Sequence, residues 1–383
     1  MPAKTPKQLL SRQVIVALPE REKAQWQTIH KQILEQFDLQ PAGQFPLSSI
    51  SVNCLVYRVS DLVDIDEVVN RLSKNPQIAL VQHNQSFEGM AARQQDDYNA
   101  LTYAPKMLKL DQIRKRATGK GVSVAIIDTG VDVDHPELQG KVTVKDNFVE
   151  GGWDSFKQDR HGTAIAGIIA ASLDLQGIDG IAPEAALAVY KACWYANPQT
   201  DKATCSSWTL AKALDAAINA GAKIINLSLA GSEDPLLAKL LDAAERKNVV
   251  VIAAAKENAR YPGFPASLAT VLPVISATPA GNFAKPSWDL GKPVFIAPGA
   301  EILTITPQQG YGFFSGSSMA TAHLTGDVAL LLEHQKNLTP SKIREILADT
   351  PLFGAKPDGL ALGFAWVNAC HALSKLDSSL FCN

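Results

Sequence analysis

From about residue 108 onward, the sequence alternates short, continuously apolar segments with helical segments, and this alternation constrains the fold more than any other feature. A strand that is apolar at every residue is buried on both faces, and parallel strands need a crossover that is usually a helix. The pattern therefore predicts a three-layer α/β domain in which helices cover both faces of a parallel sheet. The predicted strands are GVSVAIID (121–128), AALAVYKA (185–192), KIINLSL (223–229) and NVVVIAAA (248–255), and the predicted helices are HGTAIAGIIAASL (161–173), SSWTLAKALDAAINAG (206–221) and DPLLAKLLDAAERK (234–247).

The first part of the chain has a different pattern, which indicates a separate small domain. Its segments follow the order β-α-β-β-α-β, which is typical of a ferredoxin-like α+β fold. The next segment, FEGMAARQQDDYNALTYAP, has no periodicity and is typical of an exposed linker. We therefore expect a small domain over 1–86, a linker over 87–107 and the larger domain over 108–383. The segments of the small domain are RQVIVAL (12–18), EREKAQWQTIHKQILEQF (20–37), a weaker strand in AGQFPLSSI (42–50), SVNCLVYRV (51–59), DIDEVVNRLSKN (64–75) and IALVQHN (78–84).

Charge and hydropathy exclude several classes of partner. The formal net charge is −2, which gives no reason to expect binding to nucleic acid or to an anionic membrane. No apolar run approaches the roughly 20 residues that a membrane helix needs. The N-terminal residues lack the apolar segment of a secretory signal.

The five cysteines indicate disulfides rather than a metal site. No Cys-x-x-Cys pair is present, and histidine pairs at zinc spacing are absent. Cys193 and Cys205 flank a polar loop, and Cys370 and Cys382 lie near each other at the C-terminus, which leaves Cys54. This arrangement predicts two disulfides and an oxidising compartment, so that a secreted or periplasmic protein is expected. The alternative is a cytoplasmic protein with reduced thiols.

Three short segments hold residues that together could act on a peptide bond. Asp128 ends an apolar strand, His161 opens a helix of small residues, and Ser318 lies in FSGSSMATAH at the start of a long apolar helix. Serine is a poor nucleophile at neutral pH, so an imidazole must take its proton and a buried carboxylate must orient that imidazole. The sequence Asp128-Thr129-Gly130 also matches the motif that carries the catalytic carboxylate in each half of an aspartic protease. That mechanism needs two such carboxylates, and the chain has no second Asp-Thr-Gly or Asp-Ser-Gly motif.

The same segments resemble the subtilisin-like serine proteases, in which the triad follows the order Asp, His, Ser. The matching motifs are IIDTGVD, HGTAIAG, INLSLAG, the AAA that ends a strand, GSSMATAHLTG and the C-terminal GFAWVNACHAL. The family places its nucleophile third in its Gly-Thr-Ser-Met-Ala word, so the resemblance implies that Ser318 attacks, that Ser317 replaces a threonine and that Ser315 is a loop residue. Residues 12–85 resemble the family's inhibitory propeptide, which assists folding and occludes the cleft until it is cut away.

The chain departs from the family at the position of the second oxyanion donor. The family has an Asn in an Ala-Ala-Gly-Asn word, whereas this chain has Lys256 for the glycine and Glu257 for the Asn when aligned without a gap. A carboxylate beside a developing oxyanion is repulsive, and loss of such a donor costs about 3 to 4 kcal/mol. A one-residue bulge would bring Asn258 into the position instead, and we expect Asn258 to be the donor.

The resemblance also implies residues for substrate and metal binding. Ser228, Leu229 and Ala230 fall in the family strand that pairs with the substrate backbone, and Ala230 replaces a glycine. Lys256 falls where the family lines the pocket for the residue before the scissile bond, so the family's preference for large apolar residues does not carry over. No cofactor is required, but Ca²⁺ is a candidate ligand, because Glu137 and Asp174 fall at positions where the family has oxygen ligands.

The predicted function is therefore that of a serine endopeptidase that acts on polypeptides through Asp128, His161 and Ser318 and processes its own propeptide. Two alternatives remain open from the residues. The changed oxyanion segment would suit a pseudoprotease that binds peptides without cutting them. A narrowed cleft would suit an uncleaved processing protease dedicated to one partner.

Overall fold

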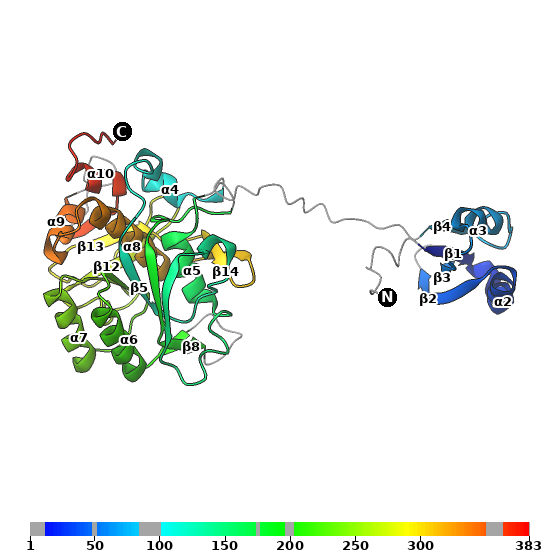
Figure 1. Cartoon of the computed structure of the whole chain (residues 1–383), viewed down its shortest axis with the longest axis horizontal. Helices are drawn as coiled ribbons and strands as arrows, with labels where there is room; N and C mark the ends of the chain where they lie inside the picture. Colours follow the sequence, from blue (N-terminus) through cyan, green and yellow to red (C-terminus); the bar gives the residue numbers. More distant parts are fainter. Residues whose placement is uncertain are drawn as a thin grey trace. The chain divides into compact units, whose positions relative to one another are not determined.

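A computed structural model describes residues 12–47, 52–83, 101–173, 177–195, 203–349 and 363–382. The chain forms two compact units, Met1–Gln94 and Gln95–Asn383, which are drawn in Figure 1. The predicted linker lies largely in residues 87–100, outside the described residues. The described end of that segment contains helix α4 (Ala104–Met107), and Ala104 is buried in the core of the larger unit.

The smaller unit is a four-stranded antiparallel sheet with strand order β2-β3-β1-β4. Its strands alternate buried and less buried residues, and the helices cover the buried face with residues such as Ile29 and Leu72. The side chain of Asp64 caps the second helix by accepting a hydrogen bond from the Asp66 N–H at 2.9 Å. The predicted β-α-β-β-α-β order is confirmed by β1 (Gln13–Pro19), α2 (Trp26–Gln36), β2 (Leu39–Leu47), β3 (Val52–Val59), α3 (Ile65–Leu72) and β4 (Leu80–His83).

One helix of this unit begins later than its sequence predicts. The predicted segment 20–37 forms a 3₁₀ helix over Glu20–Gln25 and becomes α-helical only from Trp26. No side chain caps the start of either segment.

The larger unit contains an eight-stranded sheet, ordered β16-β13-β12-β11-β10-β5-β7-β6, in which every neighbouring pair is parallel. This is the predicted parallel sheet, and the fold class is confirmed. Its strands are β5 (Ser123–Asp128), β6 (Val142–Asn147), β7 (Ala186–Lys191), β10 (Ile224–Leu227), β11 (Val250–Ala254), β12 (Val271–Ala277), β13 (Val294–Pro298) and β16 (Phe364–Trp366).

Two cores lie on opposite faces of this sheet, because successive residues of a strand point to opposite sides. In β5, Val124 and Ile126 belong to one core, whereas Ala125 and Ile127 belong to the other. The first core includes the buried faces of α5 (Arg160–Ala170), α8 (Ser317–His334), α9 (Pro340–Ala348) and α10 (Ala369–Ser374), and the second includes those of α6 (Ser207–Asn219) and α7 (Pro235–Arg246), which lie side by side in Figure 1.

Short elements surround the sheet. A hairpin of β8 (Cys193–Tyr195) and β9 (Ala203–Cys205) follows β7, and a second hairpin is formed by β14 (Ile302–Thr306) and β15 (Gly310–Phe314). Two 3₁₀ turns, η4 (Leu110–Gln112) and η5 (Pro136–Leu138), lie before and after β5. Among the described residues, no helix is both long enough and apolar enough to cross a bilayer.

Both predicted disulfides are present. Cys193 pairs with Cys205 across the β8–β9 hairpin, and Cys370 pairs with Cys382, while Cys54 is a free thiol. The first bridge joins directly opposite residues of an antiparallel pair, with a Cα–Cα distance of 4.2 Å.

Thiol counting tests this pairing. Alkylation of the unfolded, unreduced protein should label Cys54 alone, and prior reduction should make all five cysteines reactive. Closing a loop of this length contributes roughly 3 kcal/mol to stability in the chain-entropy account, so reduction should also lower the melting temperature. Five reactive thiols without reduction would contradict both pairs.

Candidate active site

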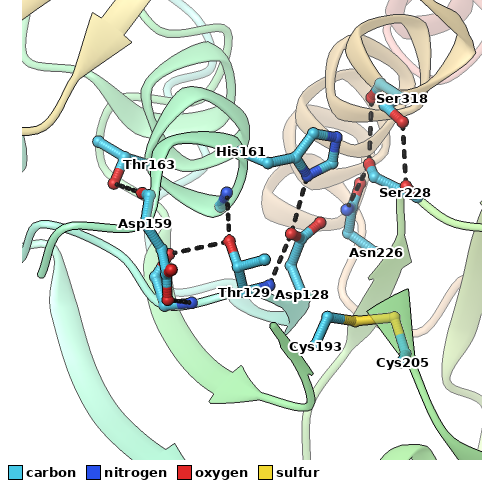
Figure 2. Close-up of polar contacts among 12 residues, drawn as sticks. Asp128, Thr129, Asp159, His161, Thr163, Cys193, Cys205, Asn226, Ser228 and Ser318 are labelled. Atoms are coloured by element: carbon cyan, nitrogen blue, oxygen red, sulfur yellow. Dashed lines mark hydrogen bonds and ion pairs between the residues drawn. A yellow bond between two sulfur atoms is a disulfide. The ribbon is translucent and has the colours of Figure 1, made fainter. Parts of the chain in front are cut away.

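The carboxylate of Asp128 and the imidazole of His161 lie in direct contact at the carboxyl edge of the sheet. Asp128 ends β5 and is 3% exposed, and His161 is the second residue of α5. His161 Nδ1 lies 2.8 Å from Asp128 Oδ1, as Figure 2 shows. The same oxygen accepts a hydrogen bond from the Thr129 N–H at 2.7 Å. A buried, hydrogen-bonded carboxylate at Nδ1 fixes the ring so that Nε2 can take a proton.

A buried ion pair supports the loop that leads into α5. Asp159 immediately precedes this helix, and its carboxylate contacts the ammonium of Lys191, which is fully buried at the end of β7. Asp159 Oδ2 also accepts from the Gly130 N–H at 2.7 Å. Burial raises the pKa of Asp159, and the hydrogen bond and charge of Lys191 oppose that shift. The pair thus ties β5, β7 and α5 together beside His161.

Further contacts position the backbone of this helix. The Gly162 N–H donates to Thr129 Oγ1 at 3.0 Å, and the His161 N–H donates to the hydroxyl of Tyr195 at 2.9 Å. Burial is the main cause that raises the pKa of Tyr195 to about 12, so this hydroxyl remains neutral at ordinary pH. Tyr195 lies in β8, and the Cys193–Cys205 hairpin is therefore linked to the helix that carries His161.

Ser318 lies at the second position of α8, next to the end of β10. Its hydroxyl donates to the Ser228 carbonyl oxygen at 3.0 Å, and the Ser228 hydroxyl donates to the Ser318 carbonyl oxygen at 3.1 Å, as Figure 2 shows. The N-terminus of a helix carries a partial positive charge that favours a developing anion. The other two serines have structural contacts: Ser315 Oγ accepts from the Glu301 N–H at 2.9 Å, and the Ser317 carbonyl accepts from the Thr321 hydroxyl at 2.7 Å.

One cleft of about 450 Å³ contains the predicted triad and three of the four predicted substrate residues. Asp128, His161 and Ser318 line it, together with the segment Ser228–Leu229–Ala230 and the disulfide Cys193–Cys205. These residues come from the ends of β5 and β10, the starts of α5 and α8 and the β8–β9 hairpin. The structure thus brings together residues that are up to 190 positions apart in sequence.

Sequence reasoning missed the buried polar residues behind this cleft. Asn226 Nδ2 donates to Ser228 Oγ at 3.0 Å, and its Oδ1 accepts from the Thr325 hydroxyl at 2.9 Å. Asp159 and Lys191 were also missed. A polar residue in the middle or at the end of an otherwise apolar strand, as in KIINLSL and AALAVYKA, is the signal that could have found Asn226 and Lys191.

The predicted oxyanion segment lies outside the residues that line this cleft. Glu257 Oε1 accepts a hydrogen bond from the Ser276 N–H at 2.5 Å, so its carboxylate is engaged with strand β12. Asn258 is exposed on the turn that follows β11. Lys256 is exposed at the start of the same turn. The role of Asn258 stays a prediction.

The predicted calcium ligands are described only in part. Glu137 is buried, and its Oε1 accepts from the Tyr311 hydroxyl at 2.8 Å. Asp174 lies outside the described residues. Within the described part of the chain, no group of three or more Asp, Glu, His or Cys side chains is arranged to hold a metal ion. Calcium can also be held by backbone and amide carbonyl oxygens, so calcium binding stays a prediction.

Comparison with known proteins identifies the family. Residues 119–365 match the model of the subtilase family, Peptidase S8. The chain belongs to the subtilase family. It is 30% identical over 304 residues to "Intracellular serine protease" of Paenibacillus polymyxa, which covers 74% of this chain and 90% of that protein. It is 32% identical over 265 residues to thermitase of Thermoactinomyces vulgaris, which covers 66% of this chain and 89% of that protein.

A solved structure shows the same subtilase fold. The crystal structure of fervidolysin from Fervidobacterium pennivorans, a keratinolytic enzyme related to subtilisin, has a TM-score of 0.64 at 21% identity. The match covers 97% of this chain and 62% of that chain. The predicted class, a serine endopeptidase of the subtilase family, is confirmed by these matches.

Proposed function

We propose that this subtilase hydrolyses peptide bonds with Ser318 as nucleophile, His161 as general base and acid, and Asp128 as the group that orients the imidazole. The observation that carries the proposal is the 2.8 Å contact between His161 Nδ1 and Asp128 Oδ1 in a cleft that Ser318 also lines. With Nδ1 held by a carboxylate, Nε2 is the nitrogen that exchanges protons with the reacting groups.

The reaction begins when the Ser318 hydroxyl leaves the Ser228 carbonyl and gives its proton to His161. Hydrogen bonds of this kind are often loose or misdirected without substrate and tighten when it binds. Ser318 Oγ then attacks the peptide carbonyl carbon, and the backbone N–H of Ser318 at the start of α8 donates to the oxyanion. His161 returns the proton to the leaving amine. Water then takes the place of the amine: it gives a proton to His161 and attacks the acyl-enzyme, and His161 returns the proton to Ser318 as the acid product leaves.

Asn258, on the exposed turn after β11, is our candidate for a second oxyanion donor. The engagement of Glu257 with the Ser276 N–H supports this choice, because it directs the repulsive carboxylate to the sheet. If neither Asn258 nor Glu257 donates a hydrogen bond to the oxyanion, turnover should be lower by about 10²- to 10³-fold. That result would favour the pseudoprotease alternative.

The test compares wild type with Ser318→Ala against a mixed peptide library and a serine-reactive probe. Wild type should cut peptides and accept the probe on Ser318, and both activities should depend on His161. A wild-type protein that binds peptides but neither cuts them nor reacts with the probe would be a pseudoprotease.

We further propose that the smaller unit is a propeptide and that the enzyme removes it. Its own buried core, with Val14, Val16 and Leu18, supports an independently folded inhibitor domain. Exposed segments between domains are where proteolysis concentrates. The residues predicted for the cut, 87–100, lie outside the described residues.

Incubation of the purified chain, followed by intact-mass measurement, tests self-processing. Wild type should be cut between about Phe87 and Ala100 and lose the residues before the cut, and Ser318→Ala should stay at 41.1 kDa. The isolated fragment of residues 1–90 should inhibit the mature enzyme competitively. An active wild type that stays whole, together with a fragment that does not inhibit, would instead favour the uncleaved processing protease.

The compartment is part of the same proposal. The comparisons do not support the predicted secretion, because the relatives from Paenibacillus polymyxa and Bacillus subtilis are named as intracellular proteases, which fits the cytoplasmic alternative. The two disulfides favour a compartment in which thiols oxidise. Thiol counting on protein taken from its source cells, with thiols blocked at lysis, separates these two cases.

A further inference from the structure

The backbone of Lys256 is held firmly beside the cleft, although its side chain is exposed. Its N–H donates to the Pro262 carbonyl at 2.8 Å, and its carbonyl accepts from the indole N–H of Trp288 at 3.0 Å. Two hydrogen bonds from different segments therefore fix where the side chain starts.

The aliphatic part of this side chain lies close to the cleft lining. A Cβ added at Gly263 would lie 3.5 Å from both Cδ and Cε of Lys256 and 3.0 Å from Cβ of Ala230. The side of Gly263 that lacks a side chain thus lies next to both the aliphatic side chain of Lys256 and the methyl group of Ala230. Gly263 has a φ of +83°, which favours glycine and keeps this face open.

Hydrogen bonds tie the segment of Gly263 to the segment of Ala230. The Gly231 N–H donates to the Phe264 carbonyl at 2.7 Å, and the Phe264 N–H donates to the Gly231 carbonyl at 3.0 Å. The position of Lys256 relative to Ala230 is therefore set by backbone contacts on both sides.

Ala230 is also close to the reacting atoms. The Ser318 hydroxyl contacts the carbonyl of Ser228, and Ala230 follows two residues later along the cleft. Two residues of extended chain span about 7 Å. The lysine stem therefore approaches the cleft beside Ala230, which lies near the nucleophile.

The charge of Lys256 has no counter-ion among the residues that the structure describes. Among the described residues, Lys256 forms no ion pair. The carboxylates of Glu257 and Glu233 have other hydrogen-bond donors, the Ser276 N–H and the Tyr261 hydroxyl at 3.0 Å respectively. A cation that has a fixed backbone and lies at the edge of a substrate cleft attracts an anionic group of the substrate.

We propose that Lys256 makes this protease prefer peptides with Asp or Glu immediately before the scissile bond. The inference rests on the proposed peptide hydrolysis and adds the substrate class.

The test measures cleavage of paired peptides that differ only by Glu or Gln at that position, by wild type, Lys256→Gln and Lys256→Glu. Wild type should favour the Glu peptide in kcat/KM by at least about tenfold, the range of a hydrogen bond to a charged group. The Glu-to-Gln ratio should fall close to one in Lys256→Gln, and Lys256→Glu should favour a Lys peptide over the Gln peptide. The wild-type ratio should also shrink as salt rises from about 0.05 M to about 0.5 M.

Lys336→Gln is the matched control, because it removes an exposed lysine beyond the far end of α8. It should keep the wild-type Glu-to-Gln ratio. The inference is overturned if wild type and Lys256→Gln are both active and show the same ratio, an outcome that leaves peptide hydrolysis itself intact. Failure of wild type to cut any peptide of the set, with no reaction of Ser318 with the probe, would overturn the proposed hydrolysis instead.

Discussion

Replacing Ser318 with alanine should lower kcat/KM for a peptide substrate by at least about 10⁴-fold. The hydroxyl that leaves the Ser228 carbonyl to attack the substrate is then gone, while the rest of the cleft is unchanged. Residual turnover would come only from substrate binding and the oxyanion donor. Steady-state kinetics on a fluorogenic peptide, with active-site titration of wild type, measures the difference.

Ser315→Ala and Ser317→Ala are the matched controls, because both serines lie within three residues of Ser318. The Ser315 hydroxyl accepts a hydrogen bond from the Glu301 N–H in a loop. Ser317 accepts from the Thr321 hydroxyl through its backbone carbonyl, which an alanine retains. Both variants should keep most activity. If Ser317→Ala were inactive and Ser318→Ala active, the assignment of the nucleophile would be wrong by one residue.

Replacing Lys191 with methionine should destabilise the larger unit by about 3 to 5 kcal/mol at neutral pH. The substitution keeps a similar apolar length but leaves the carboxylate of Asp159 buried without a counter-ion. Urea unfolding measures the loss, and it should be followed in the Ser318→Ala background so that self-digestion does not contribute.

The loss should depend on pH in a defined direction. Without Lys191, burial and the charge of Asp128 raise the pKa of Asp159 and only the hydrogen bond from the Gly130 N–H opposes them, so its folded-state pKa rises further above the unfolded value. An acid with a raised folded pKa loses stability as pH rises from its unfolded pKa through its folded pKa, because the unfolded state binds fewer protons. The difference between the variant and its parent should therefore be smaller at pH 5 than at pH 8.

Two further variants make the result specific. Lys375→Met makes the same substitution in the exposed pair Lys375–Asp349 and should change the unfolding midpoint little. Adding Asp159→Asn to Lys191→Met should recover part of the loss, because a neutral amide costs less to bury than a carboxylate. Equal losses for Lys191→Met and Lys375→Met would contradict the role of the buried pair.

Much of the architecture was determined by local sequence. Continuously apolar segments predicted β5, β7, β10 and β11 of the parallel sheet, because a strand buried on both faces has no polar side to alternate. The cysteine positions predicted both disulfides, since each pair is separated by only 12 residues. Both features depend on residues close in sequence.

Only the tertiary structure decided how distant polar groups pair around the cleft. Nothing in the sequence near Glu257 indicates that its carboxylate meets the Ser276 N–H, 19 residues later. The Ser318–Ser228 contact and the Asp159–Lys191 pair likewise join residues 90 and 32 positions apart. Strands β5, β7 and β10 end at one edge of the sheet, so polar residues at those ends are brought together by strand order and helix placement, and local sequence does not encode that order.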